Sequence, residues 1–352
     1  MHLFRKRSQK HPPSFGLHIE PTVVRAALFR EKQSGGPVLH FARETPLPEG
    51  AIENGAIREP ERVTETIKQL LAHTNRHHLP RYVVAGLPDE HGYVLTVTLA
   101  KKDTAELEES LRWEVTQHVP FAVDELYMDW ALIESNGDQE TYQVAAAPKE
   151  IVNGYTSVIE KAGLIPIGLE ISALAALRAL AFPPETSSAI VLSLGWNATT
   201  MLLATKKGIP LSLNSQNFCG SRLTSILIER LKLKPGEAEK AKIVCGLDPA
   251  CSQGVVRHAM WPEFKFLVDD CLRLMQYAAE FDAQNPCTHL VLTGSHCAIK
   301  SFPEELRLKV PLTILGTSLG PMHIPSERRH RMIPARDQSA YATVFGLATT
   351  QK

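Results

Sequence analysis

Histidine and cysteine are the side chains here that could carry metal or nucleophilic chemistry. His73 and His77 are four residues apart near the end of an expected helix, a spacing that can hold a zinc ion. No third ligand is evident nearby, so surface histidines are the favoured interpretation. The six cysteines form no CxxC pair, which predicts reduced, mostly buried thiols. No GxxxxGK[ST] motif occurs, so the signature of a P-loop is missing.

Two stretches of the sequence begin alike and suggest a duplicated architecture. Ala189–Gln216 contains three apolar or alternating runs separated by glycine-containing turns, and Phe15–Arg43 repeats this order at the start of the chain. Each stretch predicts a three-strand meander. A meander that opens each half of the chain indicates two related lobes, with a cleft faced by the first turn of each. Leu290–Gly294 adds an apolar strand that ends in a glycine turn, where nucleotides often bind in α/β folds.

Length and charge narrow the possible functions. A chain of 352 residues predicts two lobes, and a formal net charge of zero gives no support for nucleic-acid binding. No apolar stretch approaches the roughly 20 residues that span a bilayer. The segment Met1–Lys10 is basic, and each cation near an anionic leaflet contributes about 1 kcal/mol. Weak membrane contact and a plain disordered tail both remain open, and the tail is favoured.

Periodicity places the elements between these landmarks. Strands are predicted at Tyr82–Leu87, Tyr93–Leu99, Leu126–Ile133, Tyr142–Ala147 and Ile165–Glu170. Helices are predicted at Pro60–Leu71, from Asp103 to before Pro120, and at Lys149–Ala162, Ser172–Ala181, Ser221–Lys232, Gly236–Val244, Trp261–Ala283 and Ser339–Ala348. Asp103 and Glu106 resemble a capping box. The order β-α-β-β-α between Tyr93 and Ala162 predicts a compact α+β subdomain within a two-lobed α/β protein.

With these elements placed, the chain resembles the PilM family of type IV pilus assembly, itself similar to the division protein FtsA. The most specific match is Leu111–Phe121 (LRWEVTQHVPF) followed by Asp124 and Glu125, similar to the family's RWE…IPF signature. Further matching blocks are Gly50–Glu61, Val144–Glu150, Ala162–Pro166, Leu169–Ala175 and Ala342–Ala348. The resemblance extends from about Phe15 to Ala348, nearly the whole chain.

The resemblance implies an actin-like ATPase fold of two ribonuclease H-like lobes. It implies a basic tail (1–13), a first lobe (14–184) with an inserted subdomain at about 89–165, a second lobe (185–338) with a helical insert at about 219–283, and a C-terminal helix (339–352) that returns to the first lobe. It also implies a scaffold in the cytoplasm, at the inner face of the bacterial inner membrane, which binds the N-terminal cytoplasmic peptide of a PilN-like membrane protein. A pilus motor ATPase is a further implied partner. Trp113, Pro120 and Phe121 are the candidate peptide contacts, although a packing role suits them equally well.

The resemblance also implies a nucleotide cleft, but this sequence departs from the pattern. In the first turn, His18 replaces an acidic residue, and Glu20, followed by Pro21, replaces a glycine. A carboxylate repels phosphates, and proline removes a backbone donor. In the second turn, Ser193 replaces an aspartate and Trp196 follows the retained Gly195.

The third glycine turn keeps Gly294, while Ser295 and His296 replace further glycines. Glu239 and Lys242 are similar to a pair that contacts adenosine in this fold; a helix-surface salt bridge is the alternative. The candidate nucleotide-binding residues are Gly16, Thr22, Gly195, Asn197, Thr199, Glu239, Lys242, Gly294 and Ser295. No residue is assigned a catalytic or metal role, and the departures disfavour both ATP and Mg²⁺.

Three functions follow from these observations. The favoured one is a pilus scaffold with a degenerate cleft, and hydrolysis would suffer because it depends mostly on electrostatic stabilisation. The alternatives are an active ATP-hydrolysing switch with an unusual site and an FtsA-like division protein. The last is disfavoured, because only Thr-Thr-Gln-Lys follows Ala348, too short for an amphipathic membrane helix.

Overall fold

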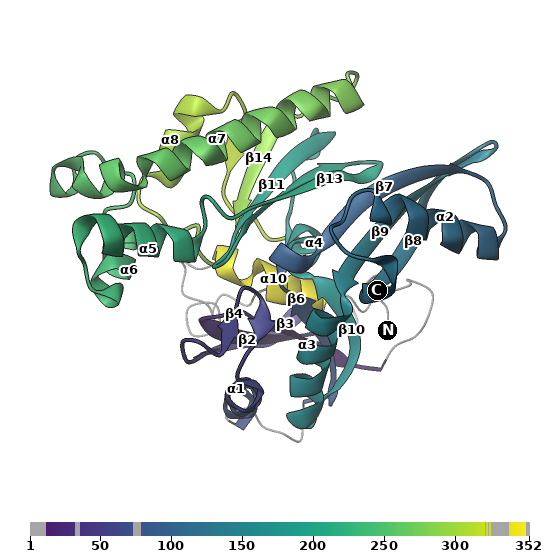
Figure 1. The fold of residues 1–352 in the computed structure, drawn as a ribbon, viewed down its shortest axis with the longest axis horizontal. Coiled ribbons are helices and arrows are strands. Elements are labelled where there is room, and N and C mark those ends of the chain that lie inside the picture. Colours follow the sequence, from purple (N-terminus) through teal and green to yellow (C-terminus); the bar gives the residue numbers. More distant parts are fainter. Residues whose placement is uncertain are drawn as a thin grey trace.

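The computed structural model describes residues 12–31, 36–72, 79–320, 322, 324 and 338–349, without the side chains of Glu31, Thr104 and Ala105. The predicted histidine pair, His73 and His77, and the basic segment up to His11 lie outside the described residues. Two lobes are visible in Figure 1, one that contains residues 14–46 and one that contains residues 188–293, with the helix α10 (Gln338–Ala348) between them.

The first sheet has five strands in the order β10-β6-β1-β2-β3. Its strands are β1 (Ser14–Ile19), β2 (Val23–Glu31), β3 (Pro37–Pro46), β6 (Tyr82–Leu87) and β10 (Ile165–Ile171). The first three form the predicted antiparallel meander, and β6 and β10 add parallel strands beside β1. A short hairpin of β4 (Ile52–Glu53) and β5 (Ala56–Ile57) precedes α1 (Pro60–Ala72).

The second sheet repeats this pattern and then continues beyond it. Its order is β15-β14-β11-β12-β13-β7-β9-β8. The first five members are β11 (Ser188–Leu194), β12 (Thr199–Thr205), β13 (Gly208–Ser215), β14 (His289–Thr293) and β15 (Thr313–Leu315). β11, β12 and β13 form the second antiparallel meander, with β14 and β15 parallel beside it. The same arrangement in both sheets confirms the predicted two-lobed, duplicated α/β architecture.

The segment predicted as an inserted α+β subdomain supplies the rest of that sheet. It contains β7 (Tyr93–Ala100), α2 (Thr104–Thr116), β8 (Leu126–Asn136), β9 (Gln139–Pro148) and α3 (Lys149–Lys161). β7 pairs with β13 at Leu95 and Leu211. The Gln143 side chain of β9 bonds to both of these strands, donating to the Leu95 carbonyl of β7 and accepting the Ile209 N–H of β13. Sequence periodicity could not predict this pairing, because the alternation within one strand does not show which other strand it pairs with. Asp103 caps α2 as predicted, accepting the Glu106 backbone N–H at 3.0 Å.

The remaining helices cover the sheets. They are α4 (Ser172–Ala179), α5 (Gly220–Leu231), α6 (Pro235–Val244), α7 (Val255–Phe281), α8 (Phe302–Lys309) and α10 (Gln338–Ala348), with short 3₁₀ turns at Asp89–His91, Val123–Glu125 and Cys251–Gly254. The prediction that the long helix starts at Trp261 is wrong by six residues, since α7 begins at Val255. Pro262 lies inside it and removes one backbone bond. Burial of Val256 and Met260 accompanies the extra turns.

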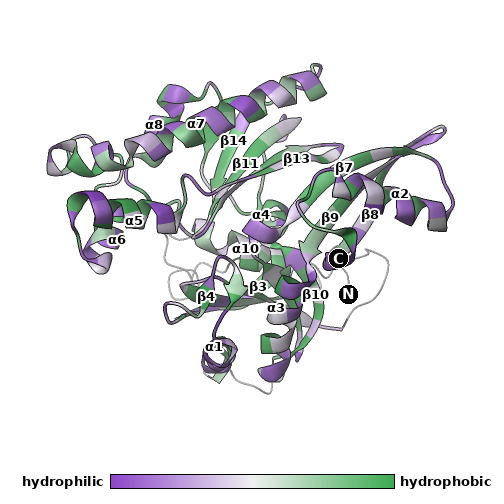
Figure 2. Cartoon of the chain, viewed as in Figure 1, coloured by the Kyte–Doolittle hydropathy of each residue, from purple (hydrophilic) through white to green (hydrophobic). Residues whose placement is uncertain are grey.

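One large cluster of buried apolar residues is centred on the first sheet and another on the second sheet. In Figure 2 the central strands are largely green, whereas the outer helices carry both green and purple. α1 buries its predicted stripe, Val63, Ile67, Leu70 and Leu71, against the first sheet. α10 packs on β1, β2 and α4 at very short range. A Cβ on Gly346 would lie 1.7 Å from a backbone oxygen of α4, so only glycine allows this contact.

The cysteine prediction needs a correction. Cys245, the residue directly after α6, and Cys251 form a disulfide with their Cα atoms 5.2 Å apart. Gly246 turns the chain between them with a φ of +50°, which a CxxC search cannot detect. The other four cysteines are free, and Cys219 and Cys271 among them are buried as predicted.

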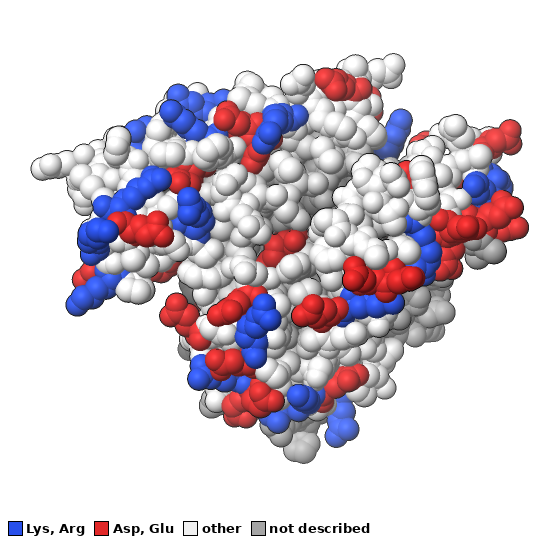
Figure 3. Space-filling model, in the orientation of Figure 1, with Lys and Arg blue, Asp and Glu red and all other residues white. Residues whose placement is uncertain are grey.

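The face of the molecule shown in Figure 3 carries interspersed charges of both signs. Within the described residues, no helix is long and apolar enough to cross a membrane. Nor does that part of the chain bring three or more His, Cys, Asp or Glu side chains together as a metal site.

Candidate functional site

The first predicted turn presents a carboxylate to the cleft between the lobes. Glu20 directly follows β1 and is only 9% exposed. Its carboxylate forms an ion pair with Arg25 of β2 and accepts a hydrogen bond of 2.7 Å from the Ser295 hydroxyl of the second lobe. Arg25 also pairs with Glu44 at 2.9 Å. The turn therefore holds an internally paired charge that connects the two lobes.

Electrostatics keep this carboxylate ionised. Burial alone opposes ionisation of Glu20, but the groups around it, His18 and Arg25 first among them, lower its pKa to about 2. Burial lowers the pKa of His18 to about 4. At neutral pH His18 is therefore uncharged, and Arg25 is the full positive charge in contact with Glu20.

The second predicted turn is closed by its own backbone and by a tryptophan. The Gly195 N–H donates to the Ala198 carbonyl at 3.0 Å, and a Cβ on Gly195 would lie 2.8 Å from that oxygen. The Trp196 ring lies 5.2 Å from the His296 ring and 5.2 Å from the Lys242 ammonium, measured to the ring centroid. A Cβ on Gly220 would come within 2.9 Å of both rings, so a glycine is required where they pack.

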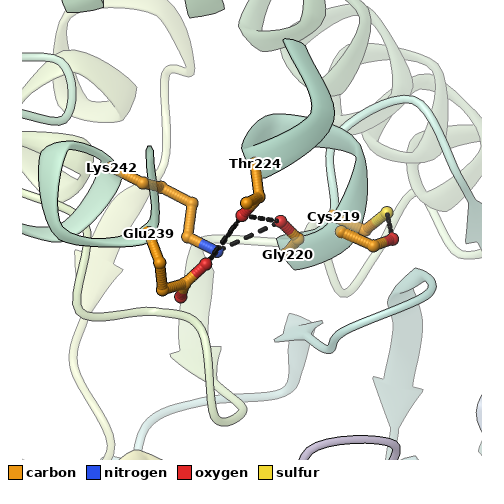
Figure 4. A network of polar contacts seen from close by, with 6 residues as sticks. Cys219, Gly220, Thr224, Glu239 and Lys242 are labelled. Atoms are coloured by element: carbon orange, nitrogen blue, oxygen red, sulfur yellow. Dashed lines mark hydrogen bonds and ion pairs between the residues drawn. The ribbon is translucent and has the colours of Figure 1, made fainter. Parts of the chain in front are cut away.

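The predicted adenosine pair is engaged with protein groups instead (Figure 4). Lys242 is 1% exposed and donates to Glu239 at 2.8 Å, to the Thr224 hydroxyl at 3.0 Å and to the Gly220 carbonyl at 3.1 Å. These three acceptors match the three hydrogens of an ammonium. Burial lowers the pKa of Lys242, and Glu239 opposes that effect.

The third glycine turn also faces its own lobe. Gly294 has a φ of +101°, and a Cβ there would lie 2.5 Å from the Leu194 carbonyl oxygen. The Gly294 N–H donates to Ser339 of α10 at 3.2 Å. Ser295 therefore reaches Glu20 from a turn whose backbone is fixed by β11 and α10.

Further polar bonds cross the cleft beside these turns. The Asn197 amide donates to Glu90 at 2.9 Å, and the Asn214 amide donates to the Asp89 carbonyl at 2.8 Å. The Asp89 carboxylate accepts the Ala173 N–H at 2.7 Å. Burial and the neighbouring charges of Glu90 and Glu20 raise the pKa of Asp89 to about 7.

The space left between the turns is small and acidic. The cavity lined by Glu20, Asp89, Glu90, Gly195 and Asn197 has a volume of about 40 Å³. That is room for a few water molecules, far less than a triphosphate and a hydrated Mg²⁺ need. An acidic group lies in the hollow between the lobes in Figure 3. The residues present therefore do not fit Mg–ATP in this arrangement.

Three further predicted nucleotide residues do not line this cavity. Gly16 lies within β1 beneath α10, where a Cβ would be 2.4 Å from the Val344 carbonyl, so helix packing accounts for this glycine. The Thr199 hydroxyl is fully buried and donates to the Phe218 carbonyl. Thr22 lies in the turn between β1 and β2, and its carbonyl accepts the Leu47 N–H at 2.9 Å.

The predicted peptide contacts are partly available on the surface. Trp113 of α2 is 61% exposed, while Leu111 and Val115 of the same helix are buried against the sheet. Pro120 is exposed, and the half-buried Phe121 packs edge-to-face on Tyr93 with ring centroids 6.1 Å apart. Packing thus explains Phe121, whereas nothing in the described structure covers most of Trp113.

Sequence reasoning missed the groups that cross the cleft. Asp89, Glu90 and Asn214 each follow or end a strand, and periodicity does not tell which lobe they face. The sequence indicated a filled cleft only through the composition of the turns. Glu20 and Trp196 occupy positions in them where small residues are usual.

Solved structures share this fold. A PilM–PilN type IV pilus biogenesis complex contains a chain that superimposes with a TM-score of 0.79 at 23% identity, covering 97% of this chain and 98% of that one. The ethanolamine utilization protein EutJ of Carboxydothermus hydrogenoformans gives 0.53 at 14% identity, covering 97% and 91%. MreB5 of Spiroplasma citri bound to ADP gives 0.53 at 11% identity, covering 96% and 95%. At these identities the likeness shows the actin-like ATPase fold.

The family is given by the sequence itself. Residues 16–352 match the family model described as type IV pilus assembly protein PilM. The match includes the Leu111–Phe121 signature and the closing helix, and it accounts for both lobes. The chain therefore belongs to the PilM family of type IV pilus assembly proteins.

Proposed function

We propose that this protein is an adaptor of the pilus assembly platform that works by binding other proteins. It holds the N-terminal cytoplasmic peptide of a PilN-like membrane protein at the inner face of the inner membrane, and its nucleotide cleft has lost most of its ability to handle Mg–ATP. The observation that carries this proposal is the Glu20–Ser295 bond, which spans the cleft where phosphates would enter. The PilM–PilN complex supports the partner, since PilN is what that relative assembles with.

The loss of nucleotide handling rests on this chain's own residues. The MreB5 structure shows that the fold can hold ADP, so the fold alone does not argue against binding. Here, however, Glu20 is ionised at neutral pH and lies beside the cavity. At 4 Å, two unit charges interact by about 4 kcal/mol at an effective dielectric constant of 20. The Glu20 carboxylate alone would repel each phosphate charge brought this close by up to an amount of that order, and the attraction of that phosphate to Arg25, the ion-pair partner of Glu20, offsets part of it.

Two assays test the cleft. A thermal-shift titration with Mg–ATP should leave the midpoint unchanged up to millimolar nucleotide, and a phosphate-release assay should show no turnover above buffer. A ligand at 100 times its Kd stabilises by about 2.7 kcal/mol, which such a titration detects easily. Micromolar stabilisation together with turnover would favour the alternative function, an active ATP-hydrolysing switch.

Trp113 is the proposed anchor for the partner peptide. Exposed tryptophans are rare, and tryptophan is among the residues that most often dominate binding free energy. Trp113→Ala should weaken binding of the PilN-like N-terminal peptide by at least tenfold in a calorimetric titration. Leu308→Ala, which removes a 75% exposed side chain on α8, serves as the control and should leave affinity unchanged. Equal affinity for both variants would remove Trp113 from the interface. A pilus motor ATPase stays a prediction as a second partner.

A further inference from the structure

A short crosslinked loop joins α6 to α7. Its ends are Cys245, directly after α6, and Cys251, which are 6 positions apart and form a disulfide. Cys245 is only 8% exposed, whereas Cys251 is half-buried and follows Pro249 and Ala250, which are both exposed. The sulfur of Cys251 is therefore the end of the bond that a thiol from solvent can reach.

The backbone directly after this loop has an unfavourable conformation. Ser252, Gln253 and Gly254 have positive φ values of 50°, 53° and 76°. A side chain other than that of glycine costs free energy in this left-handed region, so two of these three positions are strained. Such a conformation persists only where the surrounding chain enforces it. Here the crosslink at Cys251 ties one end of the segment to α6, and α7 begins at the other end.

The helix α6 is held in its lobe by few buried groups. Of its 10 residues, all of them described, only Ala238 and Lys242 are buried. Lys242 lies one turn before Cys245 and places its ammonium over the ring of Trp196 in the second cleft turn. Elements with few buried apolar contacts open locally at a low free energy. The crosslink therefore restrains the helix that carries Lys242 to the cleft.

We propose that the Cys245–Cys251 bond is a redox switch that fixes or releases α6, and with it Lys242. This inference rests on the proposed function, because a disulfide in a cytosolic protein is usually transient or redox-sensing. Under oxidising conditions the bond closes and holds Lys242 beside the cleft. Under reducing conditions the bond opens, the strained segment relaxes and α6 opens more often.

The bond opens by thiol–disulfide exchange, with glutathione as the reductant. A glutathione thiolate attacks Sγ of Cys251, the S–S bond breaks, and Cys245 leaves as a thiolate that takes up a proton. The Ser252 hydroxyl, 3.6 Å from Sγ of Cys245, is placed to donate a hydrogen bond to that thiolate. A second glutathione thiolate attacks the glutathione sulfur of the mixed disulfide, which releases Cys251 and forms glutathione disulfide. Two electrons and two protons thus pass from two glutathione thiols to the protein, and glutathione disulfide reverses the sequence.

The first test counts thiols in the full chain. Protein purified in air is equilibrated with a glutathione buffer at the cytosolic potential, quenched with acid, unfolded and alkylated. Six alkylated cysteines are expected, against four before equilibration. Four after equilibration would make the bond a permanent crosslink and overturn the proposal.

The second test measures how often α6 opens. Lys242 is 1% exposed, so an amine-acetylating reagent modifies it only when the helix opens. In the chain-entropy model, a crosslink across 6 positions lowers the opening equilibrium by roughly 40-fold, and measured effects are often smaller. Acetylation of Lys242, followed by mass spectrometry, should therefore be at least tenfold faster in the reduced protein. Lys240, an exposed lysine of the same helix, is the internal control and should react at one rate in both states.

Variants separate the crosslink from other effects of glutathione. In Cys245→Ser/Cys251→Ser, acetylation of Lys242 should be fast in both reducing and oxidising buffer. The control Cys287→Ser, at a free and half-buried cysteine, should respond to glutathione like the unaltered protein. Equal Lys242 rates in the reduced and oxidised unaltered protein, or slow acetylation in the double variant, would refute the coupling between the bond and α6. Neither assay contains ATP or peptide, so such a failure would leave the adaptor role standing.

Discussion

Removing Arg25 should expose how much the cleft depends on its buried ion pair. Arg25→Met leaves Glu20 as a buried carboxylate without its contacting cation. Breaking a buried pair by removing one partner costs about 3–5 kcal/mol. The pKa of Glu20 agrees in direction: it is lowered to about 2 by His18, Arg25, His296 and the Ser295 hydrogen bond together, so removing Arg25 takes away one of the groups that keep the carboxyl ionised. Because the Ser295 hydrogen bond remains, the lower end, about 3 kcal/mol at pH 7, is expected.

The sign of the pH dependence follows from the same value. The pKa of Glu20 is depressed in the folded state, so its contribution is present above pH 4.5 and is lost as the pH falls from 4.5 to 2. In the variant, this carboxyl takes up a proton at a higher pH. The difference in stability between the two proteins should therefore be largest at neutral pH and shrink in acid.

Urea unfolding followed by circular dichroism measures this effect. The midpoint of Arg25→Met should fall with little change in the m-value. The double variant Glu20→Gln/Arg25→Met removes the unpaired charge as well and should recover at least 1 kcal/mol of the loss. A single-variant loss under 1 kcal/mol, or a double variant less stable than the single one, would refute the account of the cleft.

Three further predictions concern pH, packing and thiols. Burial lowers the pKa values of His18 and of the half-buried His296 from 6.5 to about 4, so in the unaltered protein both make stability fall with acid between pH 6.5 and 4. Asp89, whose pKa is raised to about 7, opposes this fall. Asp89→Asn should therefore steepen it from about 1.4 to about 2.7 kcal/mol per pH unit in urea titrations. Gly346→Ala should lower the free energy of unfolding by 3 kcal/mol or more in the same assay, because the new Cβ would clash with α4. The control is Gly154→Ala in α3, where a Cβ meets nothing within 4 Å; it should raise the free energy of unfolding by about 0.5–1 kcal/mol. A thiol titration of the unfolded, unreduced protein should give four thiols, rising to six after reduction of Cys245–Cys251, and six from the start would contradict the disulfide.

Local pattern explains which elements could be predicted. The α1 stripe and the Asp103 cap depend on residues three or four positions apart, and both meanders depend on alternation within short runs. Each is visible in a short window of sequence. The start of α7 was missed because Pro262 normally marks a helix boundary, whereas burial around it here sustains the helix.

The candidate site depends on contacts between residues that are far apart in the sequence, which no short segment of it can reveal. Glu20 meets Ser295 across 275 positions, and Asn214 meets Asp89 across 125. Composition could say that Glu20 and Trp196 are unusual in a phosphate-binding turn, but not what they touch. Gly16 remains a predicted nucleotide residue, and the close approach of α10 is a second reason for a glycine there that the sequence did not reveal. Nonlocal packing decides such cases.

The central claim is that protein groups have taken the place of Mg–ATP between the lobes. Isothermal titration of the purified full chain with Mg–ATP tests it most directly. The account predicts no saturable heat up to millimolar nucleotide. Saturable, magnesium-dependent binding at micromolar ATP would contradict it.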